Sequence, residues 1–177
     1  MELTPEKTAR LHKGEILVEI DWLSADVISA SGSVFVKAAP EVVWGMLTDY
    51  AHLHQTMPKV TSSALVEAHG SCKIIEQTGK SGIFIFERSV HFRLKVDEEF
   101  PTRLHFEQVD GDFRVYEGDW FLMLAENGQG SGTILTYAAR MKPDFFAPPL
   151  LVSFVQSQDL PAILRSVRTY CESRTLD

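Results

Sequence analysis

The sequence predicts an α+β fold in which one antiparallel sheet curls around a long C-terminal helix. Two observations lead to this prediction. From residue 15 to residue 142, apolar residues alternate with polar ones in short segments, a period typical of half-buried strands. After residue 149 the apolar spacing becomes that of a helix, with Leu160, Ile163, Leu164 and Val167 at i, i+3, i+4 and i+7. A helix with such a stripe must bury it, and the sheet offers the apolar surface.

The length and composition are those of one domain. The chain has 177 residues, of which 45% are apolar, enough for one sizeable core. We expect residues 1–14 to form a polar, loosely held N-terminal segment and residues 15–177 to form the single domain.

The first elements are a strand pair at 15–21 and 26–37, followed by a change of period. Pro40 suits the first turn of a helix, which we expect over 40–50, with a short helical turn at 51–56 before Pro58. Further along, Gly-, Pro- and Asn-containing breaks separate strands that should pair with their neighbours as an antiparallel meander. The expected strands are 60–68, 71–78, 82–98, 103–109, 112–126 and 131–142.

The strand 82–98 has one buried and one wet face. Its even positions are almost all apolar and include three phenylalanines, whereas its later odd positions are polar. The even positions are Phe84, Phe86, Arg88, Val90, Phe92, Leu94 and Val96. On the next strand Leu104 and Phe106 should face the same side.

The strand 112–126 needs a change of phase. A turn at Asp110-Gly111 puts Phe113 and Val115 on the inner side, but the same phase would then bury Asp119 and expose Trp120. A bulge at Glu117-Gly118 corrects this, because one extra residue turns the following side chains to the other face. Trp120, Leu122 and Leu124 are then expected inward, with Leu135, Tyr137, Ala139 and Met141 on the last strand.

The final helix is expected over 150–174, with a kink or restart at Asp159-Leu160-Pro161. Its first residues, including Phe154, are apolar on nearly all sides. Such a segment suits contact with a ligand. Alternatively, the apolar region 145–155 could make the protein a module that binds a protein partner or, transiently, a membrane surface.

Charge and cysteine content exclude several classes of protein. The net charge is −7 and the 17 Lys and Arg are scattered, so a nucleic-acid partner is not expected. Cys72 and Cys171 lie far apart and match no metal spacing, which predicts buried, reduced thiols in a cytoplasmic protein. No segment resembles a signal peptide or reaches the length of a membrane span.

Several short segments resemble those of one known family. The segments are Val36–Trp44, Leu47–Tyr50, Met57–Val60, Gly118–Trp120 with Gly132-Thr133 and Leu135–Tyr137, and Leu160-Pro161 with Leu164-Arg165. Together, in this order, they resemble the polyketide cyclase/dehydrase and coenzyme Q-binding family over about Glu15–Cys171. The order of elements also resembles the helix-grip fold of START lipid-transfer domains and the birch pollen allergen.

This resemblance implies a hydrophobic cavity between the curled sheet and the last helix. The ligand would be a lipid, an isoprenoid quinone or an aromatic polyketide, which the protein would carry or would convert as a cyclase or dehydratase. The aromatic face could alternatively be a packed core without a cavity. No cofactor is expected. The expected ligand-binding residues are Phe84, Phe86, Arg88, Val90, Phe92, Phe106, Val115, Trp120, Leu122, Tyr137, Phe154 and Leu164.

Arg88 has two interpretations. A charge in an apolar cavity must meet a partner, because an unpaired buried charge is costly. If the turn at Lys80-Ser81-Gly82 sets the register, Glu76 lies diagonally opposite Arg88 and the two form a structural pair. Otherwise Arg88 would contact a polar group of the ligand.

No motif fixes a catalytic or metal site. Tyr116, Tyr137 and Asp119 could act as acid or base in a cyclase, but no spacing singles them out. His52 and His54 alternate without a third ligand, so we expect no metal. Gly79-Lys80-Ser81 lacks the first glycine of a phosphate-binding loop, since position 74 is Ile, and there is no G-x-S-x-G turn.

Overall fold

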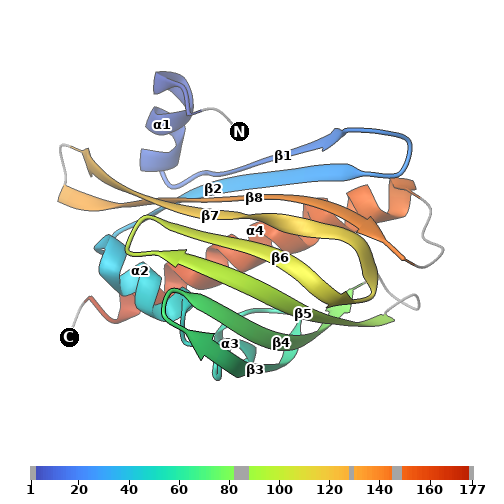
Figure 1. The fold of residues 1–177 in the computed structure, drawn as a ribbon. Helices are drawn as coiled ribbons and strands as arrows, with labels where there is room; N and C mark the ends of the chain where they lie inside the picture. The colour runs from blue at the N-terminus through green and yellow to red at the C-terminus, as the bar shows by residue number, and fades with distance from the viewer. Residues whose placement is uncertain (1–2, 82–87, 128–129, 145–148, 176–177) are drawn as a thin grey trace.

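The computed structural model describes residues 3–81, 88–127, 130–144 and 149–175; the side chains of residues 81, 88, 127 and 149–155 are not described. Eight strands and four helices follow one another in these ranges (Figure 1). They are α1 (Pro5–His12), β1 (Ile16–Trp22), β2 (Ile28–Val36), α2 (Pro40–Leu47), α3 (Leu53–Thr56), β3 (Val60–His69), β4 (Cys72–Ser81), β5 (Arg88–Glu99), β6 (Arg103–Gly111), β7 (Phe113–Asn127), β8 (Gly130–Pro143) and α4 (Pro149–Ser173).

The strands form one antiparallel sheet in the order β1-β2-β8-β7-β6-β5-β4-β3. From β3 to β8 each strand pairs with its neighbour in the chain, and β2 pairs with β8 to join the N-terminal hairpin to the meander. Helix α4 runs across the inner face of this curled sheet (Figure 1). The predicted fold class and the predicted antiparallel meander are therefore confirmed.

Helix α4 packs mainly on β1 and β2, at one side of the sheet. Gly32 of β2 permits this close approach, because a Cβ there would lie 2.8 Å from Leu164 Cδ1 and 3.1 Å from Leu160 Cδ2. The predicted stripe is buried, with Leu160, Leu164, Val167 and Cys171 all within the core. The helix is thus held against one half of the sheet and leaves space before the other half.

The predicted restart of the final helix at Asp159-Leu160-Pro161 is wrong, whereas a kink there stays a prediction. Helix α4 continues through Pro161 for 25 residues. Asp159 therefore lies within the helix instead of capping a second one. Among the described residues, no helix combines the length and the apolar character needed to cross a membrane.

The N-terminal segment is ordered, contrary to expectation. Thr4 caps α1 by accepting a hydrogen bond from the Lys7 N–H at 3.3 Å, and Pro5 occupies the first turn. Leu11 is fully buried against Leu17, Phe35 and Ile134. Helix α1 therefore covers the outer face of the sheet over β1, β2 and β8, where it closes a second, smaller core.

The bulge in β7 lies earlier than predicted. Phe113 pairs with Pro143 and Val115 with Lys142, so Arg114 is the extra residue, whereas pairing is regular through Glu117 and Gly118. Because the phase changes at Arg114, Tyr116 takes the inward position predicted for Val115. Trp120 and Leu122 face inward as expected, but Leu124 is 59% exposed near the end of the strand.

Gly118 has a different role from the predicted one. A Cβ on Gly118 would lie 2.3 Å from the Ala138 carbonyl oxygen and 2.7 Å from the Ala139 Cα. The glycine is needed because β8 passes too close for any side chain, while the bulge is accommodated four residues earlier.

Candidate functional site

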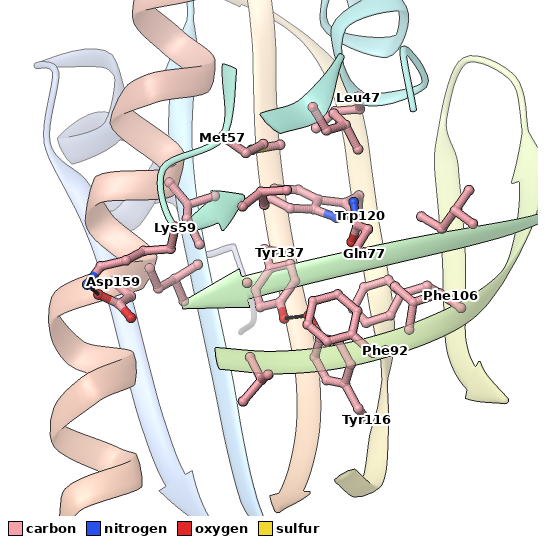
Figure 2. Close-up of a pocket in the computed structure, with 18 of the residues that line it drawn as sticks. Leu47, Met57, Lys59, Gln77, Phe92, Phe106, Tyr116, Trp120, Tyr137 and Asp159 are labelled. Carbon is pink, nitrogen blue, oxygen red and sulfur yellow. Dashed lines mark hydrogen bonds and ion pairs between the residues drawn. The ribbon is translucent and has the colours of Figure 1, made fainter. Parts of the chain in front are cut away.

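A cavity of about 200 Å³ lies between α4 and the inner face of the sheet. Its walls come from β3 to β8, from α4 and from the segment around α3 (Figure 2). The lining is mainly apolar and aromatic and includes Leu47, Met57, Ile75, Val90, Phe92, Leu94, Phe106, Phe113, Tyr116, Trp120, Tyr137, Leu160 and Ile163.

The aromatic side chains form one connected wall of this cavity. Trp120 and Tyr137 lie on adjacent strands with ring centroids 4.8 Å apart, and Phe106 stacks on Tyr137 at 5.9 Å. Phe92 meets Tyr116 edge to face at 5.5 Å. These ring contacts favour one arrangement of the wall, because aromatic pairs prefer such edge-to-face and offset-stacked geometries.

Two phenol groups introduce polarity into this wall. The hydroxyl oxygens of Tyr116 and Tyr137 lie 3.5 Å apart, so the contact is long and uses at most one of the two hydroxyl protons (Figure 2). Within the described part of the chain, these hydroxyls make no other hydrogen bond. One O–H is therefore able to donate to a polar atom of a ligand.

Burial keeps these phenols protonated. Desolvation raises the pKa of Tyr116 and raises that of Tyr137 well above the ordinary value, because a phenolate here would lose its hydration. Burial also raises the pKa of Tyr50 at another part of the lining, and the Glu98 carboxylate, which accepts the Tyr50 O–H at 2.7 Å, raises it further. Tyr116 and Tyr137 are thus hydrogen-bond donors and not bases at neutral pH.

The phenols predict a loss of stability in alkali. The unfolded chain releases these protons near pH 10 while the folded chain retains them, so the free energy of unfolding should fall above about pH 10 and be unaffected below it. The fall should be at most about 1.4 kcal/mol per pH unit for each phenol. Denaturant unfolding at several pH values measures it, and the double variant Tyr116→Phe, Tyr137→Phe should show a smaller slope. Equal slopes of the free energy of unfolding against pH for wild type and the double variant would contradict this prediction.

A second polar region lies where the cavity meets solvent. Lys59, just before β3, lies 3.9 Å from Asp159 of α4, measured from Nζ to Oδ1. Both residues line the cavity, as does Gln156 of α4, whereas Gln77 lines it beside Trp120, away from this pair (Figure 2). Gln77 is buried and its Nε2 donates to Ser63 Oγ at 3.1 Å.

Five of the predicted site residues line the cavity: Val90, Phe92, Phe106, Trp120 and Tyr137. Leu122 and Leu164 are buried in the core instead, and Val115 does not line the cavity because the bulge turns Tyr116 inward. Phe84 and Phe86 lie outside the described residues, and the side chains of Arg88 and Phe154 are likewise not described.

The strand register expected for Arg88 and Glu76 is wrong. Ser81 pairs with Arg88, which places Glu76 opposite Arg93, five residues further along β5. Glu76 Oε1 contacts His91 Nε2 at 2.9 Å. The expected turn at Lys80-Ser81-Gly82 was too early, because β4 continues to Ser81.

Asp119 is not available as an acid or base in the cavity. Its Oδ1 accepts a hydrogen bond from Arg103 Nε at 2.8 Å and lies 3.0 Å from His105 Nδ1. These residues lie on the outer face, opposite the inward Trp120. Among the described residues, no three His, Cys, Asp or Glu side chains gather as metal ligands would.

The residues that sequence analysis missed come mainly from the short segment between α2 and β3 and from α4. Met57 and Lys59 fall within a segment that carries the family resemblance, so a signal for them existed. Asp159 had no such signal. Ile163 belongs to the predicted helical stripe, but its place in the cavity wall depends on how far α4 stands from the distant strands.

A curled antiparallel sheet, a long helix on its inner face and an apolar cavity between them define a START-like domain. The family model "Polyketide cyclase / dehydrase and lipid transport" matches residues 36–168. The chain therefore belongs to this family. A comparison with curated proteins gives no match.

Solved structures with the same fold include three proteins from bacteria. The Zhui aromatase/cyclase of Streptomyces sp. R1128 is 14% identical, with a TM-score of 0.70 over 84% of this chain and 96% of that chain. A STAR-related lipid transfer protein of Xanthomonas axonopodis is 18% identical, with a TM-score of 0.69 over 88% and 93%. A protein of Thermus thermophilus is 18% identical, with a TM-score of 0.69 over 82% and 98%. At these identities the likeness shows the shared fold.

Proposed function

We propose that the protein binds a compact, largely aromatic small molecule in this cavity and acts as its carrier or chaperone. The observation that supports this most strongly is the cavity itself, which is walled by apolar and aromatic side chains around a few polar groups, the usual composition of a ligand site. Membership of a family named for polyketides and lipid transport agrees with such a ligand.

The volume of the cavity favours a small ring system. A cavity of roughly 150 Å³ in another protein holds benzene, and sites for drug-sized ligands run from about 300 Å³ upward. The 200 Å³ found here suits one or two fused rings. Among the three expected ligand classes, this favours an aromatic polyketide or the ring portion of a quinone over an extended lipid or isoprenoid chain.

The test is binding of a simple aromatic hydrocarbon. Methylnaphthalene should quench or shift the fluorescence of the protein on titration, because Trp120 lines the cavity. Native mass spectrometry followed by solvent extraction should identify the molecule carried by the purified protein. Absence of both methylnaphthalene binding and a co-purified hydrophobic molecule would contradict the proposal.

The second candidate is an enzyme of the polyketide cyclase or dehydratase class, favoured by the two phenols. An O–H of Tyr116 or Tyr137 that donates to a substrate carbonyl would stabilise the oxyanion formed during aldol-type ring closure. Asp119 cannot contribute because it lies on the outer face.

The phenol variants distinguish a carrier from an enzyme. Tyr116→Phe and Tyr137→Phe should leave methylnaphthalene affinity within about twofold, because the hydrocarbon accepts no hydrogen bond. In a carrier, a carbonyl-bearing ligand is released chemically unchanged from wild type and variants alike. In an enzyme, wild type converts a poly-β-keto substrate to a cyclised product, and each variant slows this by about 100-fold or more. Mass spectrometry of the recovered ligand reads both outcomes.

The third function considered from the sequence, a docking surface for a membrane or protein partner at residues 145–155, concerns side chains outside the described part of the structure.

A further inference from the structure

The ion pair between Lys59 and Asp159 joins two distant parts of the chain at the cavity. Lys59 precedes β3 and Asp159 lies in α4, and both line the cavity on the side where α4 passes (Figure 2). The Lys59 side chain is 39% exposed and that of Asp159 is 18% exposed. The pair therefore lies at the mouth of the cavity, with one group toward solvent and the other largely enclosed.

The separation of the two charged atoms is too long for a direct hydrogen bond. Nζ and Oδ1 are 3.9 Å apart, whereas a direct N–H···O bond requires roughly 2.7–3.2 Å. Neither side chain makes another polar contact in the part of the chain that the structure describes. Desolvation raises the pKa of Asp159, although the nearby ammonium opposes this. The enclosed carboxylate is therefore incompletely satisfied by the protein.

A single oxygen atom can form hydrogen bonds with both the Lys59 ammonium and the Asp159 carboxylate. An oxygen at about 2.8 Å from each of two atoms separated by this distance sees them at an angle of roughly 90°, which a hydroxyl oxygen tolerates. A hydroxyl can accept from the ammonium through a lone pair and donate its proton to the carboxylate. A carboxylate ligand could accept from Lys59 but would be repelled by Asp159 at close range.

The backbone of Lys59 supports a role beyond linking two elements. Its φ is 71°, in the left-handed region that non-glycine residues seldom adopt and that a glycine would occupy without strain. The Lys80 N–H donates to the Lys59 carbonyl at 2.7 Å and holds this conformation. Strained residues of this sort are found preferentially at ligand sites.

We propose that Lys59 and Asp159 form a subsite that binds a hydroxyl group of the ligand, so that the preferred ligand is a hydroxylated aromatic compound such as a phenol. This inference rests on the proposed binding function, with the ring system in the aromatic part of the cavity. The hydroxyl then replaces a bridging water at the mouth, which keeps both charged groups hydrogen-bonded.

The experiment compares ligands that differ in one group at the same ring position: naphthol, methylnaphthalene and naphthoate. For the wild-type protein, naphthol should bind about tenfold more tightly than methylnaphthalene, the effect of a hydrogen bond to a charged group. In Lys59→Met and in Asp159→Leu this preference should fall to about twofold or less. The double variant should lose no more than either single variant, because the bridge needs both groups.

Two further variants separate loss of the subsite from loss of stability and from loss of a lysine elsewhere. Lys59→Gly removes the ammonium and relieves the backbone strain, so it should fold at least as stably as wild type and still lose the preference for naphthol. Lys95→Met is the matched control, because this lysine also pairs with carboxylates, Asp97 at 2.9 Å and Glu107 at 3.2 Å, and does not line the cavity. It should keep the full preference.

The possible failures can be told apart. Binding of methylnaphthalene and naphthol with equal affinity, or a preference that persists in Lys59→Gly and Asp159→Leu, would overturn the hydroxyl subsite while leaving the binding function intact. Tighter binding of naphthoate than of naphthol would also overturn it, in favour of an acidic ligand. If neither methylnaphthalene nor naphthol binds to the wild-type protein, the proposed function fails and the subsite fails with it.

Discussion

Gly118→Ala should destabilise the protein by about 3 kcal/mol or more, one of the largest effects expected of a single methyl group in this chain. The added Cβ would lie 2.3 Å from the Ala138 carbonyl oxygen and 2.7 Å from the Ala139 Cα. Both are backbone atoms of β8, so no side-chain rotation relieves the contact and the strands must separate locally. Thermal unfolding should shift downward by roughly 6–12 °C for a chain of this length.

Gly45→Ala is the matched control for this variant. Gly45 lies inside α2, and a Cβ there meets no atom within 4 Å. The substitution should raise stability by up to about 1 kcal/mol, because alanine has the higher helix propensity. Equal thermal stability of Gly118→Ala and wild type would show that β7 and β8 do not approach as closely as described.

Ile163→Trp should abolish ligand binding while the protein remains folded. Ile163 projects from α4 into the cavity and is one of the lining residues. A larger side chain at this position fills empty space instead of displacing packed atoms, so stability should change little or increase. Methylnaphthalene affinity should fall by about 100-fold or more, because the ring system and the indole cannot occupy the same 200 Å³.

The control is Gln158→Trp, which adds the same indole to an exposed position of the same helix outside the cavity lining. Its affinity for methylnaphthalene should equal that of wild type. Unfolding curves for both variants separate loss of the cavity from loss of the fold. Undiminished binding by a folded Ile163→Trp protein would place the ligand elsewhere.

Most of the strands in the sheet could be predicted from the alternation of apolar and polar residues. The even positions of β5 that the structure describes, Val90, Phe92, Leu94 and Val96, are buried as predicted, because a strand with one dry face needs no information from other elements. The stripe of α4 was equally readable. The presence of a cavity followed from the resemblance and not from the period, since a packed core has the same pattern.

The position of the bulge and the presence of the N-terminal helix were not predicted correctly from the sequence, for two different reasons. A phase change anywhere between Asp110 and Trp120 would have met the same hydrophobic pattern, so the sequence could not place it at Arg114. Helix α1 did have a local signal, Thr4 followed by Pro5 and Glu6, which is typical of a helix start. The hydrophobic pattern of α1 is weak, because the helix has few apolar residues and buries only one narrow stripe centred on Leu11. The helix was therefore not predicted.

The pair at the mouth could not be predicted from local sequence at all. Lys59 and Asp159 meet only because α4 packs against Gly32 and thereby passes close to the start of β3. Contacts of this kind depend on the packing distance of a whole helix, which no short window of sequence contains.

Helix α4 follows the eight described strands in the chain, and this order has a consequence for biosynthesis. The strands leave the ribosome before α4. Until α4 has been synthesised, the apolar concave face of β4 to β8 is exposed and the cavity is not formed. The proposed ligand can therefore bind only after α4 has been made. The proposed ligand would contact both this late-made helix and earlier segments, and would therefore stabilise the folded domain by an amount that rises with the logarithm of its free concentration above Kd.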